Sequence, residues 1–190
     1  VAVPVAKTGL IYNGSVQTGV STTNTLITLG GATTGTAAGS YNATAALPNG
    51  NYCWGSNGGT DTAQKTITWT IAKASVAVPS VTGTSFVYNA AAQSPTPSAI
   101  DTALVTLTNT AQTDVGSYTT TFALKDTRNY KWAVAQSGKG ESDAYVFNWA
   151  ITKADITLTA PTYDATLVGG GSDGKTYIGM TVADLVINQS

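Results

Sequence analysis

The sequence predicts an all-β protein: two tandem antiparallel β-sandwiches followed by a C-terminal partial repeat or strand tail. Three observations predict this fold class. Apolar residues alternate with polar ones, the chain repeats itself once, and the composition disfavours helices. Hydrophobic residues make up 42% of the chain and charged residues only 10%, well below the share of about 25% usual in soluble domains. Thr, Ser, Asn and Gly replace the missing charge, and this mixture suits strands better than solvated helices.

The repeat covers most of the chain, as five blocks that recur in the same order. The blocks are Ala-Val-Pro at 2–4 and 77–79, Tyr-Asn at 12–13 and 88–89, Gly-Ser-Tyr at 39–41 and 116–118, Asn-Tyr-x-Trp at 51–54 and 129–132, and Trp-x-Ile-x-Lys-Ala at 69–74 and 149–154. The offset only grows along the chain, as expected if loops differ in length while strands stay constant. We therefore expect a first repeat over 1–74, a second over 75–154, and a partial third repeat or assembly tail over 155–190.

In the first repeat, the Gly-Ser-Tyr block begins a strand that ends at a Pro-Asn-Gly turn at 48–50. A polar loop at 55–61 then leads to a strand at 66–71, in which every second residue is a threonine. Side chains on one face of such strands form the core. The residues expected to face this core are Tyr41, Ala45, Leu47, Trp54, Ile67, Trp69 and Ile71.

The second repeat follows the same order, with a turn at 124–127 and a polar loop at 136–143. Its expected core residues are Tyr118, Phe122, Leu124, Trp132, Phe147, Trp149 and Ile151. Phe122 replaces Ala45, so we expect the two cores to be packed differently nearby. Tryptophans can also stack on sugars, and Trp54 and Trp132 are the candidates for that role if they are exposed.

The chain has no histidine, and Cys53 is its only cysteine. These counts exclude His-based catalytic triads, Cys-His zinc sites and intrachain disulfides. We expect no enzymatic activity, and we predict no catalytic, cofactor-binding or metal-binding residue. Cys53 is interpreted as a half-buried or buried filler because its counterpart is Lys131; an intermolecular disulfide is the alternative.

The net charge of −1 comes from nine basic and ten acidic residues that form no basic stripe. Nucleic acid is therefore not an expected partner. No apolar run approaches the roughly 20 residues needed to span a bilayer, so we expect no membrane span. The chain starts without Met and without a charged-then-apolar leader, so we expect a processed or excised piece.

Residues 169–176 match the phosphate-loop pattern G-x-x-x-x-G-K-[ST]. Such a loop needs a parallel sheet and a following helix, whereas the surrounding pattern is that of antiparallel strands. We interpret this segment as a β-turn.

Two further chemistries would depend on the acidic and lysine residues. An intramolecular isopeptide bond needs a lysine in an apolar core beside an acid, but Glu141, the only Glu, lies in a polar loop. Calcium favours oxygen-rich loops, but the loop carboxylates lack Asp-x-Asp spacing, so we interpret them as solvated. These carboxylates are Asp61, Asp114, Asp143 and Asp173.

The block Asp-Val-Gly-Ser-Tyr ending at Tyr118 resembles the tyrosine corner of immunoglobulin-like sandwiches, in which a Tyr bonds back to upstream backbone. Tyr41 holds the same place in the first repeat. The cysteine of antibody domains is replaced by Ala43 and Thr120. Together with the repeated Asn-Tyr-x-Trp and Trp-x-Ile-x-Lys-Ala blocks, residues 1–154 resemble the tandem immunoglobulin-like repeats of large bacterial surface proteins of the adhesin type.

The resemblance implies a non-catalytic structural or adhesive segment, located outside the cell on its surface. Its implied partners are neighbouring copies or adjacent repeats, and glycans on a host or other surface. A decoration or fibre module of a phage or other virion is one alternative. A carbohydrate-binding module of a secreted enzyme is another.

The Lys-Ala pairs at 73–74 and 153–154 mark the junctions between repeats, and almost no linker separates the flanking strands. A short linker restricts the angle between repeats, which predicts a semi-rigid stalk. In the alternative interpretation, Lys73 and Lys153 are only solvated linker charges.

The tail begins like the first strand of a third repeat, with Ile156 and Leu158 as its apolar residues. A segment of 36 residues is too short to bury a core of its own, and an ordered strand must pair its backbone. We expect this strand to add to a sheet edge, of the second repeat or of a neighbouring copy, and to mediate assembly.

Overall fold

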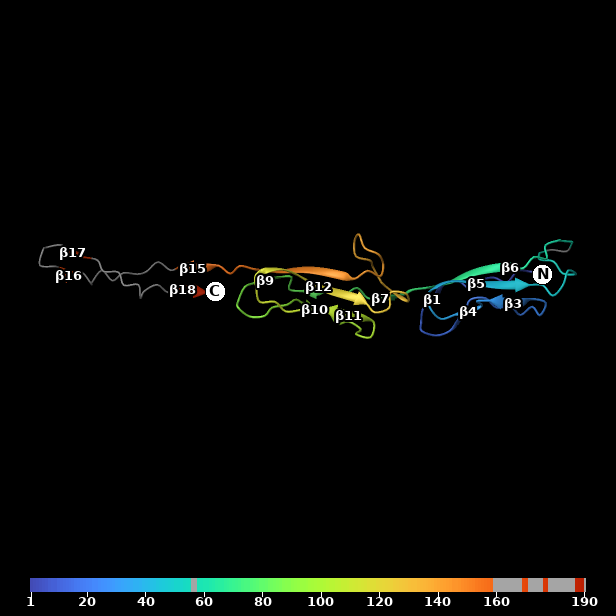
Figure 1. Ribbon diagram of the computed structural model, residues 1–190, viewed down its shortest axis with the longest axis horizontal. Coiled ribbons are helices and arrows are strands. Elements are labelled where there is room, and N and C mark those ends of the chain that lie inside the picture. Colours follow the sequence, from blue (N-terminus) through green and yellow to red (C-terminus); the bar gives the residue numbers. More distant parts are fainter. Residues whose placement is uncertain (56–57, 159–168, 171–175, 178–186, 190) are drawn as a thin grey trace. The chain divides into compact units, whose positions relative to one another are not determined.

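The computed structural model describes residues 1–55, 58–158, 169–170, 176–177 and 187–189 (Figure 1). The fold is all-β and sandwich-like, and no helix occurs among the described residues. It follows that this part of the chain has no helix long and apolar enough to cross a membrane.

The first sheet has four strands in the order β1-β6-β5-β3, and β2 and β4 form a separate pair. Strands β5 and β6 are long because Thr and small or apolar residues alternate without interruption. The strands are β1 (Leu10–Ile11), β2 (Gln17–Thr18), β3 (Thr28–Gly31), β4 (Thr34–Gly35), β5 (Gly39–Ala46) and β6 (Lys65–Ala72).

The second four-stranded sheet has the order β9-β14-β12-β11, which repeats the first strand for strand. The short pairs β8–β10 and β7–β13 accompany it. The strands are β7 (Ala74–Val76), β8 (Val81–Thr82), β9 (Ser85–Val87), β10 (Thr96–Pro97), β11 (Val105–Thr108), β12 (Gly116–Leu124), β13 (Tyr130–Trp132) and β14 (Tyr145–Thr152).

Each sheet contains one parallel pair, which the prediction of antiparallel sandwiches did not include. β1 runs parallel to β6, and β9 runs parallel to β14. A parallel pair requires a long connection, and here the intervening strands of the repeat provide it. The registers correspond as well: Ile11 pairs with Ala72 as Val87 pairs with Thr152.

The predicted strand parity is confirmed by burial in β6 and β14. Trp69 and Trp149 are 2% and 3% exposed, and the threonines between the apolar residues of β6 face outward. The core of the first repeat consists of Leu10, Val20, Ile27, Ala43, Ala45, Trp54, Ile67, Trp69 and Ile71. A second cluster consists of Val76, Val105, Phe122, Leu124, Trp132 and Tyr145.

The two cores differ around Phe122, as predicted. Phe122 is fully buried and its ring meets that of Phe147 edge to face, with centroids 5.8 Å apart. In the first repeat the same two positions hold Ala45, also fully buried, and Ile67. The second core therefore replaces two aliphatic side chains with an aromatic pair.

Two compact units emerge from the contacts, and their boundaries do not coincide with those of the repeats. The first unit comprises Val1–Thr82, Pro97–Thr108 and Thr120–Phe147; the second comprises Gly83–Thr96, Asn109–Thr119 and Asn148–Ser190. The whole junction around residues 73–76 lies inside the first unit. The division at residues 74 and 154 remains a prediction from the repeat.

The tail forms pairs with itself. β15 (Ile156–Leu158) pairs antiparallel with β18 (Ile187–Gln189). The expectation that the strand of Ile156 and Leu158 adds to a sheet edge of the second repeat is therefore wrong, because the tail supplies its own partner strand. Addition to a neighbouring copy remains a prediction.

The segment that matches the phosphate-loop pattern begins in β16 (Gly169–Gly170) and ends in β17 (Thr176–Tyr177), and these two strands pair antiparallel. Thr176 lies in a strand, where a phosphate loop requires the first turn of a helix. Residues 171–175, with Asp173 and Lys175, lie outside the described residues.

Candidate functional site at the repeat junction

The repeats join without a loop, because β6 ends at Ala72 and β7 begins at Ala74. β7 runs parallel to β13, so Ala74, Ser75 and Val76 pair with Tyr130, Lys131 and Trp132. The Ala74 N–H donates to the Asn129 carbonyl at 2.9 Å. The short linker that the sequence predicts is confirmed, and the contacts below surround it.

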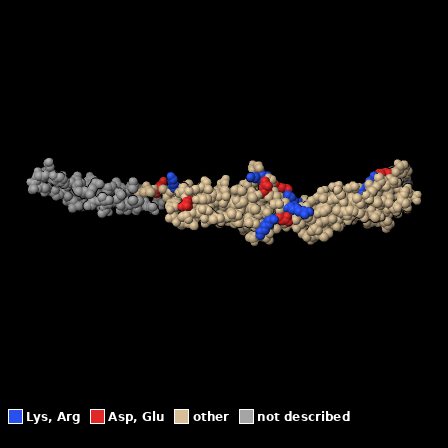
Figure 2. Space-filling view, in the orientation of Figure 1, with Lys and Arg blue, Asp and Glu red and all other residues tan. Residues whose placement is uncertain are grey.

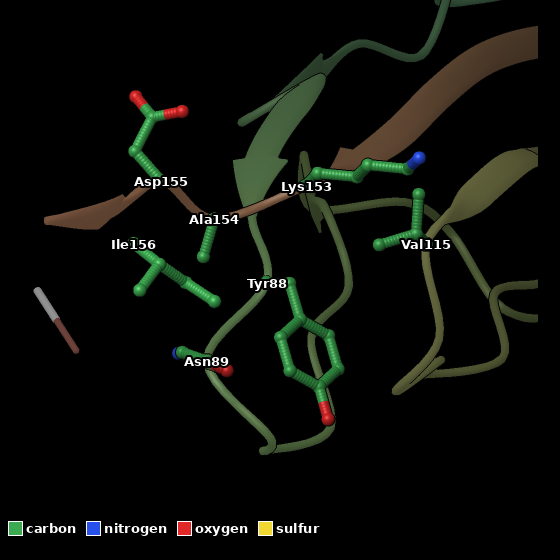
Figure 3. Close-up of a pocket in the computed structure, with 7 residues that line it drawn as sticks. All are labelled: Tyr88, Asn89, Val115, Lys153, Ala154, Asp155 and Ile156. Carbon is green, nitrogen blue, oxygen red and sulfur yellow. The ribbon is translucent and has the colours of Figure 1, made fainter. Parts of the chain in front are cut away.

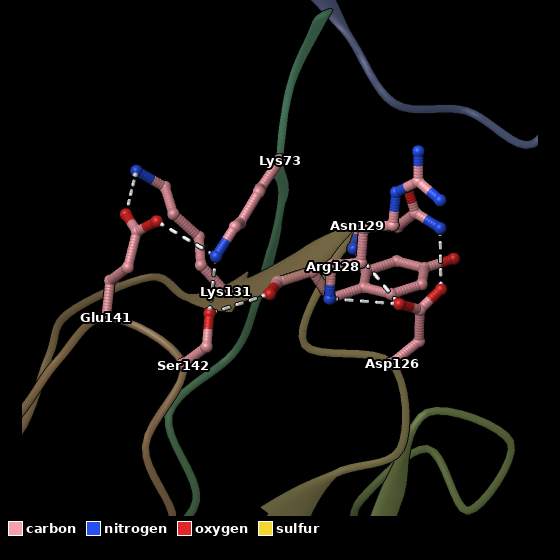
Figure 4. Close-up of polar contacts among 8 residues, drawn as sticks. Lys73, Asp126, Arg128, Asn129, Lys131, Glu141 and Ser142 are labelled. Carbon is pink, nitrogen blue, oxygen red and sulfur yellow. Dashed lines mark hydrogen bonds and ion pairs between the residues drawn. The ribbon is translucent and has the colours of Figure 1, made fainter. Parts of the chain in front are cut away.

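Asn129 connects the two sides of the junction through its side chain, whose contact with Asp126 is drawn in Figure 4. Its Oδ1 accepts a hydrogen bond from the backbone N–H of Ala38 at 2.8 Å. Its Nδ2 donates to Asp126 Oδ2 at 2.7 Å, while Asp126 Oδ1 accepts from the backbone N–H groups of Arg128 and Asn129, both at 3.1 Å. Asp126 thus orients the amide, and the hydrogen bond from Asn129 is the main reason that the pKa of Asp126 is lowered.

Glu141 forms ion pairs with two lysines at the same junction. Lys73 Nζ lies 3.2 Å from Oε1, and Lys131 Nζ lies 3.2 Å from Oε2. Lys73 also donates to Ser142 Oγ at 3.1 Å, and Ser142 Oγ donates to the Tyr130 carbonyl at 3.0 Å. Hydrogen bonds from Lys131 and then Lys73 lower the pKa of Glu141.

These charges lie at the surface, so their attraction is screened by solvent. The side chains of Lys73, Lys131 and Glu141 are 30%, 38% and 50% exposed. On the face that Figure 2 shows, charged side chains gather in a few groups and most of the surface carries none. Lys73 is therefore more than a solvated linker charge, yet it lies outside the apolar core that an isopeptide bond requires.

An aromatic contact completes the junction. The rings of Tyr12 and Tyr130 meet at 83°, with centroids 5.3 Å apart. Edge-to-face geometry of this kind is favourable beyond the area that it buries.

The predicted tyrosine corners are confirmed, and the first of them supports this site. Tyr41 donates from its hydroxyl to the Ala37 carbonyl at 2.6 Å, and Tyr118 donates to the Asp114 carbonyl at 2.8 Å. Ala37 directly precedes Ala38, whose N–H is bound by Asn129. The corner therefore holds the loop that receives the Asn129 side chain.

Trp54 and Trp132 are buried as predicted, at 6% and 2% exposure. Trp132 Nε1 donates to the Asp143 carbonyl at 2.8 Å, and its backbone N–H donates to the Glu141 carbonyl at 2.9 Å. Trp132 thus anchors the loop that carries Glu141. With all four tryptophans buried, none of them offers a face on which a sugar could stack.

Trp69 and Trp149 differ in their polar contacts. Trp69 stacks on Tyr41 at 4.5 Å and donates from Nε1 to the Ala32 carbonyl at 2.6 Å. A Cβ at Gly19 would lie 1.9 Å from the Trp69 ring, so only glycine allows this close approach. Trp149 Nε1 has no acceptor among the residues that the structure describes.

Two of the loop carboxylates considered for calcium, those of Asp61 and Asp143, have other partners. Asp61 forms an ion pair with Lys65, which lowers the pKa of Asp61, and Asp143 Oδ2 accepts from the Gly140 N–H at 2.8 Å. Within the described ranges, no three Cys, Asp or Glu side chains are grouped as metal ligands would be. Cys53 is half-buried, as predicted.

Sequence reasoning missed the residues that connect the repeats, namely Ala38, Asp126, Asn129, Glu141 and Ser142. One signal was available: Asn precedes Tyr in both Asn-Tyr-x-Trp blocks, and a core role for Tyr and Trp does not explain that Asn. The arrangement can hold β7, β13 and the loop of Ala38 together. The polar side chains of Asn129 and Glu141 find their partners within the junction itself.

Comparison of the chain with protein-family models, with curated proteins and with solved structures found no match.

Proposed function

We propose that this chain is a non-catalytic structural segment of an extracellular bacterial surface protein, in which immunoglobulin-like repeats form a semi-rigid stalk. The single observation that carries the proposal is the junction. Strand β7 follows β6 directly, and hydrogen bonds, ion pairs and a ring contact from Asn129, Glu141 and Tyr130 hold the two sides together. A segment that acts as a stalk needs a junction that limits bending between its repeats, whereas independent binding modules do not.

The immunoglobulin-like part of the proposal rests on features found in both repeats. Each has a tyrosine corner, and each pairs its first sheet strand in parallel with its last. The buried tryptophans argue against the carbohydrate-binding alternative, since that function needs exposed rings.

Relative motion of the repeats tests the stalk. We expect ¹⁵N relaxation of the full chain to give amides of β5 and β12 the same rotational correlation time. A Gly-Ser-Gly-Ser insertion between Ala72 and Lys73 should give the two strands different and shorter times, while the same insertion in the exposed loop at 58–60 should change nothing. Independent tumbling of the unmodified chain would contradict the proposal.

Location is tested separately, by antibody labelling of intact bacterial cells and of purified virions. We expect labelling of cells. Labelling of virions alone would favour the virion alternative.

A further inference from the structure

Each repeat pairs its first sheet strand in parallel with its last, and this pairing decides how the repeat responds to tension. In the first repeat, Leu10 pairs with Ile71 and Ile11 pairs with Ala72. The Tyr12 N–H donates to the Ala72 carbonyl at 2.9 Å. Tension along the chain pulls β1 toward its N-terminal end and β6 toward its C-terminal end. Because two parallel strands pulled in this way slide along each other, their hydrogen bonds are loaded together rather than one at a time.

The second repeat has the same arrangement with a longer strand pair. Three residues of β9 pair with three of β14, whereas two of β1 pair with two of β6. Both strands of the longer pair end at the same edge, where the chain continues into Tyr88 and Lys153 (Figure 3). The Ala150 N–H donates to the Thr84 carbonyl at 3.0 Å, and the Tyr88 N–H donates to the Thr152 carbonyl at 2.9 Å.

A side chain strengthens the second pair further. Thr152 Oγ1 donates to the Phe86 carbonyl at 3.1 Å. Ala72 holds the corresponding position of the first repeat, because each of the two residues ends its strand and directly precedes a Lys-Ala pair. Ala72 has no hydroxyl, so the first repeat lacks this hydrogen bond.

Another side-chain contact at these strands is the same in both repeats. Gln17 Nε2 donates to the Ile11 carbonyl at 2.9 Å, and Gln93 Nε2 donates to the Val87 carbonyl at 3.0 Å. The two strand pairs therefore differ in the additional residue pair of the second repeat and in the hydroxyl of Thr152.

We propose that this chain bears tension and that its first repeat unfolds first, while the second repeat stays folded at the same force. The inference rests on the proposed stalk, because only a segment held at both ends experiences tension. Forced unfolding is governed by the unfolding rate, which is higher for the strand pair with fewer hydrogen bonds. Unfolding frees the chain between Ile11 and Ala72, about 20 nm when extended, and this added length lowers the tension on the second repeat.

Single-molecule force spectroscopy of the full chain, held by tags fused to both of its ends, tests the order of unfolding. A Gly-Ser insertion of about ten residues in the exposed loop at 58–60 marks the first repeat, because it lengthens the chain that this repeat releases by about 3.5 nm. We expect the first unfolding step under steadily rising force to carry this extra length. A first step without it in most traces, or equal unfolding forces for the two repeats, would overturn the proposed order.

The hydroxyl of Thr152 allows a test with single substitutions. Thr152→Val removes the hydroxyl at nearly constant volume and should raise the unfolding rate of the second repeat at constant force by about fivefold, as expected for one hydrogen bond. Ala72→Thr should slow the first repeat. Thr70→Val is the control, because Thr70 is exposed on β6 and its side chain has no hydrogen bond among the described residues; it should change neither rate by more than about twofold. An unchanged rate in Thr152→Val would show that this hydroxyl bears no load.

The direction of pulling distinguishes load on β1 and β6 from general stability. With Cys53→Ser, the substitutions Gly50→Cys and Thr60→Cys place both attachment points beside the adjoining ends of the antiparallel strands β5 and β6, so tension separates these strands one residue pair at a time. A Cβ at Gly50 would contact nothing within 4 Å. We expect the first repeat to unfold at least tenfold faster than when the chain ends are pulled with the same force. Equal rates would overturn the proposal but would leave the stalk intact, since relaxation measures stiffness without tension.

Discussion

Trp69 and Trp149 occupy equivalent positions of the two repeats but differ in the hydrogen bonding of their indole N–H groups. Both are buried in equivalent strands, and both contact the ring of a corner tyrosine, at 4.5 and 4.9 Å. Only Trp69 has an acceptor for its N–H among the described residues. A buried donor without a partner costs about 1–3 kcal/mol of folding stability. The second repeat carries this cost at Trp149, and the first avoids it at Trp69.

Replacing each tryptophan by phenylalanine should therefore have unequal effects. Trp69→Phe loses a hydrogen bond and leaves the Ala32 carbonyl without its donor, whereas Trp149→Phe removes an unpaired donor along with the same ring volume. We expect Trp149→Phe to reduce local stability by at least about 1 kcal/mol less than Trp69→Phe. Hydrogen exchange of the Ile71 and Ile151 amides measures the two repeats separately. Equal losses would contradict the difference in hydrogen bonding.

Asn129 and Asn51 offer a matched pair at the same position of the two repeats. Asn129→Ala removes the bonds to Ala38 and Asp126, and we expect it to cost about 1–3 kcal/mol of unfolding free energy in urea. Asn51 has no such side-chain partner among the described residues, so Asn51→Ala should change stability by less than about 0.5 kcal/mol. An equal loss of stability in both variants would show that Asn129 acts through its own turn rather than across the junction.

At the scale of elements, β7 decides how the repeats meet. It follows β6 without a loop and pairs with β13, which places Lys131 and the Glu141 loop beside Lys73. The ion pairs are exposed and each contributes little alone. Their arrangement around a strand pair still makes the junction sensitive to pH and salt.

Glu141 gives that sensitivity a definite sign. Its pKa is lowered from the ordinary value of 4.5 in the folded chain, so its contribution is present above pH 4.5 and is lost as the pH falls through the lowered folded value. We expect Glu141→Gln to lower the thermal midpoint at pH 7 and low salt, and the difference from the unmodified chain to vanish near pH 2 or in 1 M NaCl. A difference that persists at pH 2 would contradict an ionic origin.

At the scale of the whole molecule, the described part of the chain carries one completed junction between the two repeats. The completed junction involves residues up to 91 positions apart, all within one compact unit. The tail has its own strand pairs, β15–β18 and β16–β17. The strand of Ile156 and Leu158 stays the predicted origin of assembly between copies.

Deletion of residues 156–190 tests the tail as the origin of assembly. If the strand of Ile156 and Leu158 mediates association between copies, light scattering should show that the full chain associates and that the shortened chain is monomeric. Association that persists in the shortened chain would contradict this role of the tail.

The repeat, the all-β class and the side of each long strand that faces the core could all be predicted from the residues alone. The same holds for the burial of Trp54, Trp69, Trp132 and Trp149. These properties follow from local alternation, because successive side chains of a strand point to opposite faces whatever the strand packs against. The tyrosine corners were predictable for the same reason, since Tyr41 and Tyr118 bind only four residues upstream.

Other features became evident only once the chain was folded: the parallel pairing of β1 with β6, the partner of β15, and the contacts of Ala38 with Asn129 and of Lys73 with Glu141. Each of these joins residues far apart in the chain, and the polar ones involve residue types that are equally common in solvated loops. Their partners depend on how one strand enters the next repeat, because a hydrogen bond or ion pair forms only where folding brings two groups within about 3 Å.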